Sequence, residues 1–268
     1  MTPKFITSRA NPAVKEAARL LTPGGRKKTG RFLLEGARLC ADAAANGFPL
    51  KTLFVTERAK EQYAREYDLC TDAAEETCLI DPSVAEKLSD VGSTQGFFAV
   101  AEKREAIFTL DPDGLYVLTD RVQNPDNLGA LSRTAEALGA AGLILAGGCD
   151  LYTPKALRAS MGALLRLPVL QTDDAPGFLH GCRERGMRAV AAVLDPAAVD
   201  IRALSLPGGR VLVIGNEGAG VSDEVKAACT DLALIPMPGR AESLNAAAAA
   251  AILIWELQRG RKGPVNHE

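Results

Sequence analysis

Two apolar patterns alternate along the chain. Short apolar runs, which predict strands, are followed by longer segments whose apolar residues recur at helical spacing. In the first third, the candidate strands are RFLLEG, TLFVT, TCLID and GFFAVAEK, and the candidate helices are residues 7–21, ARLCADAAANG and PSVAEKLSD. This alternation predicts an α/β domain with a largely parallel sheet. The polar, Gly-rich segment TPGGRKKTGR is expected to be a loop.

The alternation resumes after AIFTLDPDG at 106–114, a segment with turn residues that predicts a linker. Beyond it the candidate strands are 115–120, 142–147, 169–172, 188–195, 210–217 and 231–237, and the candidate helices are 128–139, 154–164, 175–185, 222–229 and 245–258. Nearly continuous apolar strands are typical of a parallel sheet covered on both faces. The sequence therefore predicts a smaller α/β domain over 1–105, the linker, and a second α/β domain over 115–268.

Charge is distributed unevenly between these parts. The whole chain carries a net charge of −2, yet its first 38 residues hold nine basic and two acidic residues. A basic end on an acidic body is typical of a surface that binds phosphates. A solvated helix face and loop would give the same pattern, so charge alone leaves both interpretations open.

Several classes of protein fit the sequence poorly. The N-terminus lacks the apolar core of a secretion signal, and the longest apolar stretch, Ala246 to Trp255, is too short to span a bilayer. The six cysteines form no CxxC pair and the chain has two histidines, so the spacing of a zinc site is missing. We expect a cytoplasmic protein with reduced thiols, no metal and no membrane association.

The first of three segments with candidate chemistry is DRVQNPDNLGALSRTAEALGA, residues 120–140. It follows a predicted strand, at the end where ligands bind in α/β sheets. Asn127 is a candidate N-cap of the next helix, and Arg133 follows on the second turn. From these residues alone, Asn127 could be only a cap and Arg133 only a surface arginine.

The second segment, VLVIGNEGAGVS at 211–222, passes from an apolar strand into a glycine-rich turn. Glycine allows a tight turn and a close approach of a ligand to the backbone. The glycine order differs from that of a dinucleotide-binding loop, and Glu217 would repel a phosphate. A nucleoside without phosphates, such as S-adenosylmethionine, suits this loop, and an ordinary strand-to-helix turn is the alternative.

The third segment, IPMPGRAESLNAAAAAAILIWEL at 235–257, ends a strand and begins a long helix. Ser243 or Asn245 can cap that helix. Beside the glycine loop, this segment would supply backbone groups to the edge of an adenine. Taken alone, a turn before a capped helix explains it better.

Together, N-x-x-N-L-G-A-x-x-R, G-N-E-G-x-G and I-P-M-x-G-x-x-E-S-L-N resemble the three motifs of the SpoU family of RNA 2′-O-ribose methyltransferases, in order and spacing. FLLEGARL at 32–39 and STQGFFAV at 93–100 resemble the substrate-binding domain often attached to this family, which is similar to ribosomal protein L30e. The resemblance covers nearly the whole chain.

The resemblance implies a C-terminal α/β domain with a deep trefoil knot, preceded by the smaller L30e-like α/β domain. It implies that the knot binds S-adenosylmethionine and that the protein is a homodimer. The expected RNA is ribosomal, because the L30e-like extension is typical of ribosomal members. By position, the implied cofactor-binding residues are Gly215, Asn216, Gly220, Ile235, Met237, Ser243 and Leu244, and the implied catalytic residues are Asn127, Arg133, Glu217, Ser243 and Asn245.

The sequence offers no obvious general base, because neither histidine lies near a motif. A guanidinium is hard to deprotonate, so we expect Arg133 to stabilise the developing 2′-alkoxide and to bind the adjacent phosphate. Asn127 would hold Arg133 or the ribose, and Glu217 would orient Arg133. The alternatives are a transfer-RNA methyltransferase, a non-catalytic RNA-binding protein of the same fold, and an oxidoreductase or nucleotide-binding enzyme that uses the glycine loop.

Overall fold

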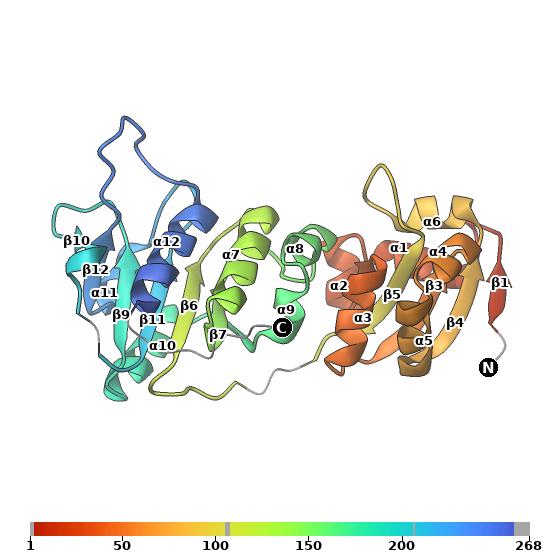
Figure 1. Ribbon diagram of the computed structural model, residues 1–268, viewed down its shortest axis with the longest axis horizontal. Coiled ribbons are helices and arrows are strands. Elements are labelled where there is room, and N and C mark those ends of the chain that lie inside the picture. The colour runs from red at the N-terminus through yellow and green to blue at the C-terminus, as the bar shows by residue number, and fades with distance from the viewer. Residues whose placement is uncertain (1–2, 105–107, 206, 260–268) are drawn as a thin grey trace. The chain divides into compact units, whose positions relative to one another are not determined.

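The chain divides into two compact units in the computed structural model, which describes residues 3–104, 108–205 and 207–259 (Figure 1). Unit 1 comprises Met1–Glu105 and Asp150–Arg166, and unit 2 comprises Ala106–Cys149 and Leu167–Glu268. Segment 150–166, which the sequence pattern assigns to the second domain, thus packs with unit 1. Residues 106 and 107 of the expected linker, and residue 105 before it, lie outside the described residues.

Unit 1 is built on a mixed sheet with the strand order β1-β4-β3-β5-β2. Its strands are β1 Lys4–Ile6, β2 Arg31–Glu35, β3 Leu50–Val55, β4 Ala74–Ile80 and β5 Phe97–Glu102. β1, β4 and β3 are parallel, but β5 runs antiparallel to β3 and β2. The prediction of a largely parallel sheet here is therefore wrong. After β4 the chain forms a short helix, α6, and then enters β5 from the same end of the sheet at which β4 finished. β5 therefore runs in the opposite direction to β4.

The helices of unit 1 are α1 Pro12–Arg19, α2 Pro23–Thr29, α3 Ala37–Ala45, α4 Glu57–Gln62, α5 Ala64–Ala73, α6 Pro82–Leu88, α8 Pro154–Ala159 and α9 Ala163–Arg166. α2 lies within TPGGRKKTGR, so the prediction of a loop there is wrong. Thr22 caps α2 by accepting a hydrogen bond from the Gly25 amide at 3.2 Å, and Pro23 occupies the first position. Gly30 ends the helix in a left-handed conformation. These end signals outweigh the poor helix propensity of the two internal glycines.

A buried arginine ties α2 to segment 150–166 within unit 1. Arg26 is 1% exposed, and its Nε donates to the Asp150 carboxylate at 2.7 Å. Its Nη1 donates to the carbonyl oxygens of Leu20 and Leu21 at 2.8 and 3.1 Å. A buried guanidinium needs such partners, because an unpaired charge in the interior is costly.

Unit 2 is built on a parallel seven-stranded sheet with the order β10-β12-β9-β11-β6-β7-β8. Its strands are β6 Leu115–Asp120, β7 Gly142–Ala146, β8 Val169–Thr172, β9 Arg188–Ala192, β10 Val199–Asp200, β11 Arg210–Ile214 and β12 Asp231–Leu234. The predicted parallel sheet is confirmed, although β9, β11 and β12 each end three residues earlier than the apolar pattern suggests. The residues that follow these three strands form loops instead.

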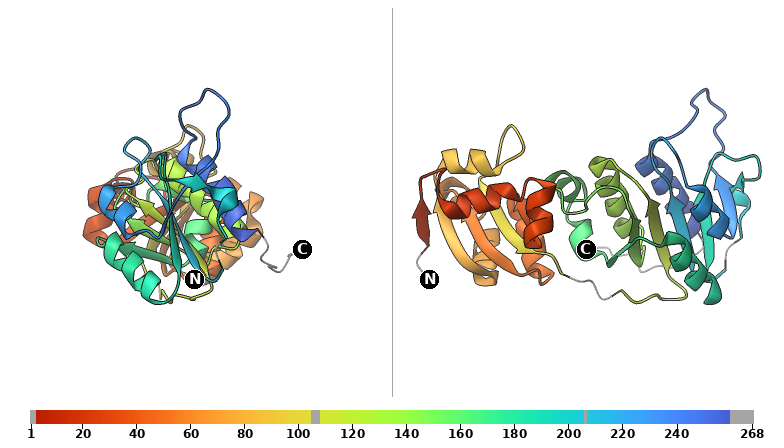
Figure 2. Two further views of the ribbon diagram at one scale, coloured as in Figure 1. Left: turned by 90° about the vertical axis from the view of Figure 1, so that its left-hand side faces the viewer. Right: turned by 180° about the vertical axis from the view of Figure 1, so that it is seen from behind.

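Helices cover both faces of this sheet (Figures 1 and 2). They are α7 Pro125–Ala137, α10 Ala175–Glu184, α11 Asp223–Ala228 and α12 Ala246–Gln258, with a 3-10 turn at Ile201–Ala203. α10 and α11 share a core with one face of β6, β7, β9 and β11. On the other face α12 packs against α7, and Gln258 Nε2 donates to the Leu138 carbonyl at 3.0 Å.

The described residues hold neither a membrane-spanning helix nor a metal-binding group of side chains. No helix in them combines the length and the apolar character needed to cross a bilayer. Within the same ranges, no three His, Cys, Asp or Glu side chains are grouped so that they could hold a metal ion.

The Arg26–Asp150 pair generates a stability prediction. Arg26→Ala removes one partner of a largely buried ion pair and is expected to cost unit 1 about 3 kcal/mol of unfolding free energy. Hydrogen exchange of the β2 and β5 amides measures this. Lys27→Ala, which removes an exposed neighbour, is the control and should change the value by less than about 0.5 kcal/mol. Equal effects of the two substitutions would show that the buried pair is not stabilising.

Candidate active site

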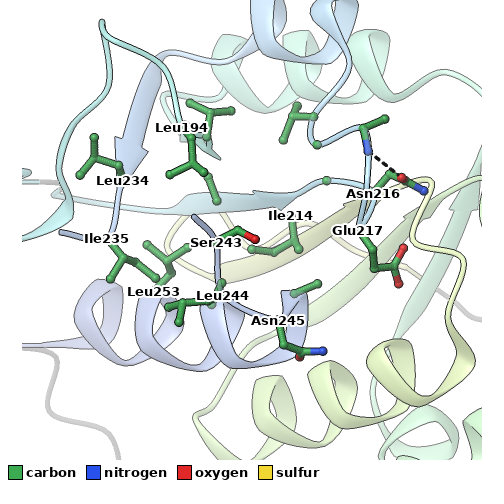
Figure 3. Close-up of a pocket in the computed structure, with 18 of the residues that line it drawn as sticks. Leu194, Ile214, Asn216, Glu217, Leu234, Ile235, Ser243, Leu244, Asn245 and Leu253 are labelled. Atoms are coloured by element: carbon green, nitrogen blue, oxygen red, sulfur yellow. Dashed lines mark hydrogen bonds between the residues drawn. The ribbon is translucent and has the colours of Figure 1, made fainter. Parts of the chain in front are cut away.

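A cavity of about 760 Å³ opens at the carboxyl edge of the unit 2 sheet (Figure 3). Because β6, β9, β11 and β12 are parallel, their carboxyl ends meet at one edge. The cavity is bounded by the loops after β9, β11 and β12 and by the first turns of α7 and α12. A volume of this size is typical of small-molecule sites.

The cavity brings together every predicted site residue except Arg133. Those that line it are Asn127, Gly215, Asn216, Glu217, Gly220, Ile235, Met237, Ser243, Leu244 and Asn245. Segment 120–140 therefore meets the two later segments, 211–222 and 235–257, at one place, as expected from the parallel strands that precede them.

The glycine loop after β11 closes on itself. Asn216 and Gly220 exchange two backbone hydrogen bonds at 2.9 and 3.0 Å, and the Asn216 side chain accepts from the amides of Gly218 and Ala219. A Cβ on Gly215 would lie 2.1 Å from the Gly220 carbonyl carbon, so only glycine fits at 215. Asn216 Nδ2 also donates to the Arg121 carbonyl at 2.8 Å, which fastens the loop to the end of β6.

Asn127 is not the N-cap of α7, and that prediction is wrong. Asn124 is the N-cap, its side chain accepts from the Asp126 amide at 2.9 Å, and Pro125 occupies the first helical position. Asn127 instead lies in the first turn, 7% exposed. Its side chain is therefore free to bond with other segments.

A chain of side-chain hydrogen bonds links the three segments. Asn127 Nδ2 donates to Glu217 Oε1 at 2.9 Å, and Asn127 Oδ1 accepts from Asn245 Nδ2 at 2.8 Å. The Asn245 oxygen accepts from the amides of Ala247 and Ala248, so Asn245 is the predicted N-cap of α12. We call this chain the Glu217–Asn127–Asn245 network.

Glu217 is held as a carboxylate. Besides Asn127, the amides of Gln123 and Asn124 donate to it at 3.1 and 3.0 Å. Desolvation by burial acts to raise the pKa of Glu217, but the hydrogen bonds from Asn127 and from these amides prevail and hold the pKa below its usual value. The carboxylate therefore stabilises the loop that leads into α7.

Arg133 lies apart from this network. It is exposed on α7, and within the described part of the chain its side chain has no hydrogen-bond or ion-pair partner. Arg133 follows Asn127 by six residues. At about 100° per residue, Arg133 therefore lies well away from the face of α7 that carries Asn127. Neither Asn127 nor Glu217 contacts Arg133 in this chain, and Glu217 binds the start of α7 instead.

Several residues that line the cavity lie outside the three predicted segments or were not predicted as site residues. Leu194 and Asp195 follow β9, Lys226 comes from α11 and Leu253 from α12. Lys226 Nζ lies 3.4 Å from Asp195, and hydrogen bonds from the Ala197 amide and Lys226 lower the pKa of Asp195. The polar end of the β9 segment, VLD, is a signal that could have pointed to Asp195.

The lining indicates which ligand fits. The side-chain charges on the cavity wall are the carboxylates of Asp195 and Glu217 and the ammonium of Lys226. Phosphates would be repelled by the carboxylates, whereas a cationic ligand would be attracted. Leu194, Ile214, Ile235 and Leu253 supply apolar surface for a flat ring (Figure 3). The lining thus suits a cationic nucleoside without phosphates, such as S-adenosylmethionine.

A parallel α/β domain with a cavity at its carboxyl edge is typical of α/β proteins that bind a ligand there, and similarity to known proteins identifies the family. Residues 114–255 match the SpoU rRNA Methylase family, and residues 11–99 match the MRM3-like substrate binding domain. The chain belongs to the SpoU rRNA Methylase family. The family and enzyme class that the three motifs predict are confirmed.

Similar proteins span nearly the full length. The chain is 34% identical to the 23S rRNA (uridine(2479)-2'-O)-methyltransferase of Streptomyces viridochromogenes, over 96% of this chain and 92% of that protein. It is 32% identical to the 23S rRNA (guanosine(2553)-2'-O)-methyltransferase RlmP of Bacillus subtilis, over 95% and 99%. The crystal structure of an AdoMet-bound rRNA methyltransferase from Sinorhizobium meliloti aligns with a TM-score of 0.86, at 31% identity over 97% and 99%.

The hydrogen bonds of Glu217 generate a pH prediction. Glu217→Gln replaces one carboxylate oxygen with an NH2 group, which then faces the hydrogen-bond donors that bind the carboxylate in the wild type. This substitution should weaken S-adenosylmethionine binding about tenfold. Because the folded-state pKa of Glu217 is lowered, its contribution to stability is fully present above the usual pKa and is lost as the pH falls through the folded-state value. The difference in Tm between wild type and Glu217→Gln should therefore be constant from pH 8 to about 4.5 and shrink below that.

Glu184→Gln on α10 is the matched control, because it neutralises an exposed carboxylate away from the cavity. It should give no pH-dependent difference in Tm. A Glu217→Gln difference that grows as the pH falls would contradict the assignment.

Proposed function

We propose that this protein transfers a methyl group from S-adenosylmethionine to a ribose 2′-hydroxyl of ribosomal RNA. The observation that carries the proposal is the Glu217–Asn127–Asn245 network at the mouth of a cavity that suits a cationic nucleoside. Membership of the SpoU family and the names of the two 23S rRNA methyltransferases support the reaction and the class of RNA.

The cavity residues would hold the cofactor, which supplies an already activated methyl group. Gly215, Gly220, Ile235 and Leu244 would contact it through the backbone and apolar surface, and Asn216, Met237 and Ser243 would complete its surroundings. Glu217 and Asp195 would favour its positive charge.

The protein's contribution to the reaction is alignment. Holding the 2′-oxygen in line with the methyl group contributes about 7–11 kcal/mol in well-oriented systems. Asn127 and Asn245 have fixed amide groups at the cavity, where they would hold the ribose. Arg133 would stabilise the negative charge that develops on the 2′-oxygen while the proton leaves to water.

We infer that Arg133 performs this role in the cavity of a second copy of the chain. Within its own chain it lies outside the cavity. Beside α7, Ile252 and Trp255 of α12 are 44% and 66% exposed, and with Ala248 they form an apolar stripe at helical spacing. Exposed apolar surface of this kind favours an interface. A homodimer would cover the stripe, and each subunit would place its Arg133 at the cavity of the other subunit.

We also propose that the C-terminal part of unit 2 forms the family's trefoil knot. β11 lies between β6 and β9, β12 lies beyond β9, and the chain then returns so that α12 packs against α7. This crossing back over earlier strands supports a threaded chain. It would also explain why the cavity is walled by segments from both sides of β11.

Unit 1 would bind the RNA, and the enzyme would work in the cytoplasm on ribosomal RNA. The basic side chains of α1 and α2 that reach solvent, Lys15, Arg19, Lys27 and Lys28, are candidates for phosphate contacts. The match to a substrate binding domain supports this role. Because Val14, Ala17 and Arg26 of the same helices are buried, point substitutions test the role better than truncation.

Methyl transfer tests the proposed reaction. Labelled S-adenosylmethionine is incubated with the protein and with ribosomal or transfer RNA from cells that lack it. We expect label in one ribosomal RNA species and at least a 100-fold lower rate for Arg133→Ala. Cofactor binding measured in parallel separates two failures: no label despite binding favours a non-catalytic RNA-binding protein, and no binding contradicts the cofactor assignment.

Mixed dimers test the exchange of Arg133. Asn127→Ala and Arg133→Ala are each expected to be inactive alone, whereas a mixture allowed to exchange subunits should recover about a quarter of wild-type activity. The heterodimer would contain one cavity with an intact Asn127 and the partner's intact Arg133. A mixture that stays inactive, although subunit exchange is verified, would place Arg133 in the site of its own chain.

A further inference from the structure

Arg121, directly after β6, has a backbone conformation that L side chains rarely adopt. Its φ is 56°, and among the described non-glycine residues only Met161 shares a positive φ. The backbone of Arg121 is fixed from two sides: its amide donates to the Ala146 carbonyl at 2.9 Å, and its carbonyl accepts from Asn216 at 2.8 Å. Glycine would adopt this conformation freely, so an arginine at this position points to a use for its side chain.

The guanidinium of Arg121 is oriented by a buried carboxylate. Its Nε donates to Asp120 Oδ1 at 3.0 Å, and the Asp120 side chain is 4% exposed. The other Asp120 oxygen accepts from the Ser222 amide at 2.7 Å, so the carboxylate is itself fixed. The Arg121 side chain is 51% exposed, and in the described ranges its two Nη groups have no partner. They form an oriented, open pair of donors.

Two exposed glycines lie next to Arg121 and Val122. Gly147 and Gly148 follow β7 with φ of 68° and 91°. A Cβ built on Gly147 would lie 3.5 Å from the Arg121 Cγ, which places the two residues in contact. Gly148 packs so closely on Val122 that a Cβ there would meet the Val122 carbonyl oxygen at 2.2 Å. Among the residues described, neither glycine amide has an acceptor.

We propose that Arg121 and the amides of Gly147 and Gly148 bind a backbone phosphate of the RNA, next to the ribose that enters the cavity. The inference rests on the proposed function and names a contact with its substrate. Guanidinium Nη groups and glycine amides without side chains above them are typical ligands of phosphate oxygens. Arg121 does not line the cavity, but its carbonyl is bonded to Asn216, which does. The phosphate contact therefore lies beside the site of methyl transfer.

Arg121→Gly tests this contact because glycine keeps the left-handed backbone while the guanidinium is lost. Binding of a fluorescein-labelled single-stranded RNA 12-mer and of S-adenosylmethionine is measured from 50 to 300 mM KCl, with Tm recorded for each variant. We expect RNA binding to weaken about tenfold at low salt, and the slope of log affinity against log salt to fall by about 0.7. S-adenosylmethionine affinity should stay within twofold, and Tm should not decrease.

Arg183→Ala is the control, since it removes an exposed arginine near the end of α10, which leads to the amino edge of the sheet. It should leave RNA affinity and the salt slope unchanged. Unchanged RNA binding by Arg121→Gly overturns the proposal. So does a lower Tm with weaker cofactor binding, which would make Arg121 only a structural partner of Asp120. The assay measures RNA binding and not methyl transfer, so the two proposals can fail separately. Weaker RNA binding by Arg121→Gly, together with no methyl transfer by the wild type, would support the phosphate contact and contradict the proposed reaction.

Discussion

Glu217 and Asn245 lie 90 and 118 residues after Asn127 in the sequence, and the site depends on the hydrogen bonds that join the three side chains. The carboxylate of Glu217 also binds the two amides before α7, while Asn245 caps α12. Glu217 thus joins the glycine loop to the start of α7, and Asn127 joins Glu217 to the start of α12 through Asn245. Helix starts and the glycine loop cannot shift independently, and this fixes the cavity between them.

Charge divides the surface into two regions with different ligands. Inside the cavity, carboxylates and apolar side chains suit a cationic nucleoside and disfavour phosphate. Outside it, Arg121 is oriented by Asp120, and Arg133 is exposed on α7. Under the proposed function, these arginines would bind the RNA backbone while the cavity excludes it. The same sheet edge would then distinguish the methyl donor from the methyl acceptor by electrostatics.

The sequence predicts the cavity well because the carboxyl ends of parallel strands meet at one edge, so the residues after β11 and β12 had to converge. It also predicts the Asn245 cap, because an Asn before an alanine-rich helix is a strong local signal. Prediction from the sequence fails where two local structures are both plausible and contacts with other residues decide which one forms. Asn124-Pro125 forms the cap that was assigned to Asn127, and segment 150–166 packs with unit 1 through partners more than a hundred residues away. The position of Arg133 relative to Asn127 follows from helical spacing, but the role proposed for Arg133 requires a second copy of the chain, which the sequence of one chain does not place.

The chemical position of the transferred methyl group decides whether the ribose is the acceptor. Ribosomal RNA methylated by the enzyme with labelled S-adenosylmethionine is digested to nucleosides, which are separated and identified by mass. We expect the label on the ribose of one nucleoside, as a 2′-O-methyl group. Label on a base would contradict the alignment of a 2′-hydroxyl by Asn127 and Asn245, even if the cofactor site were correct.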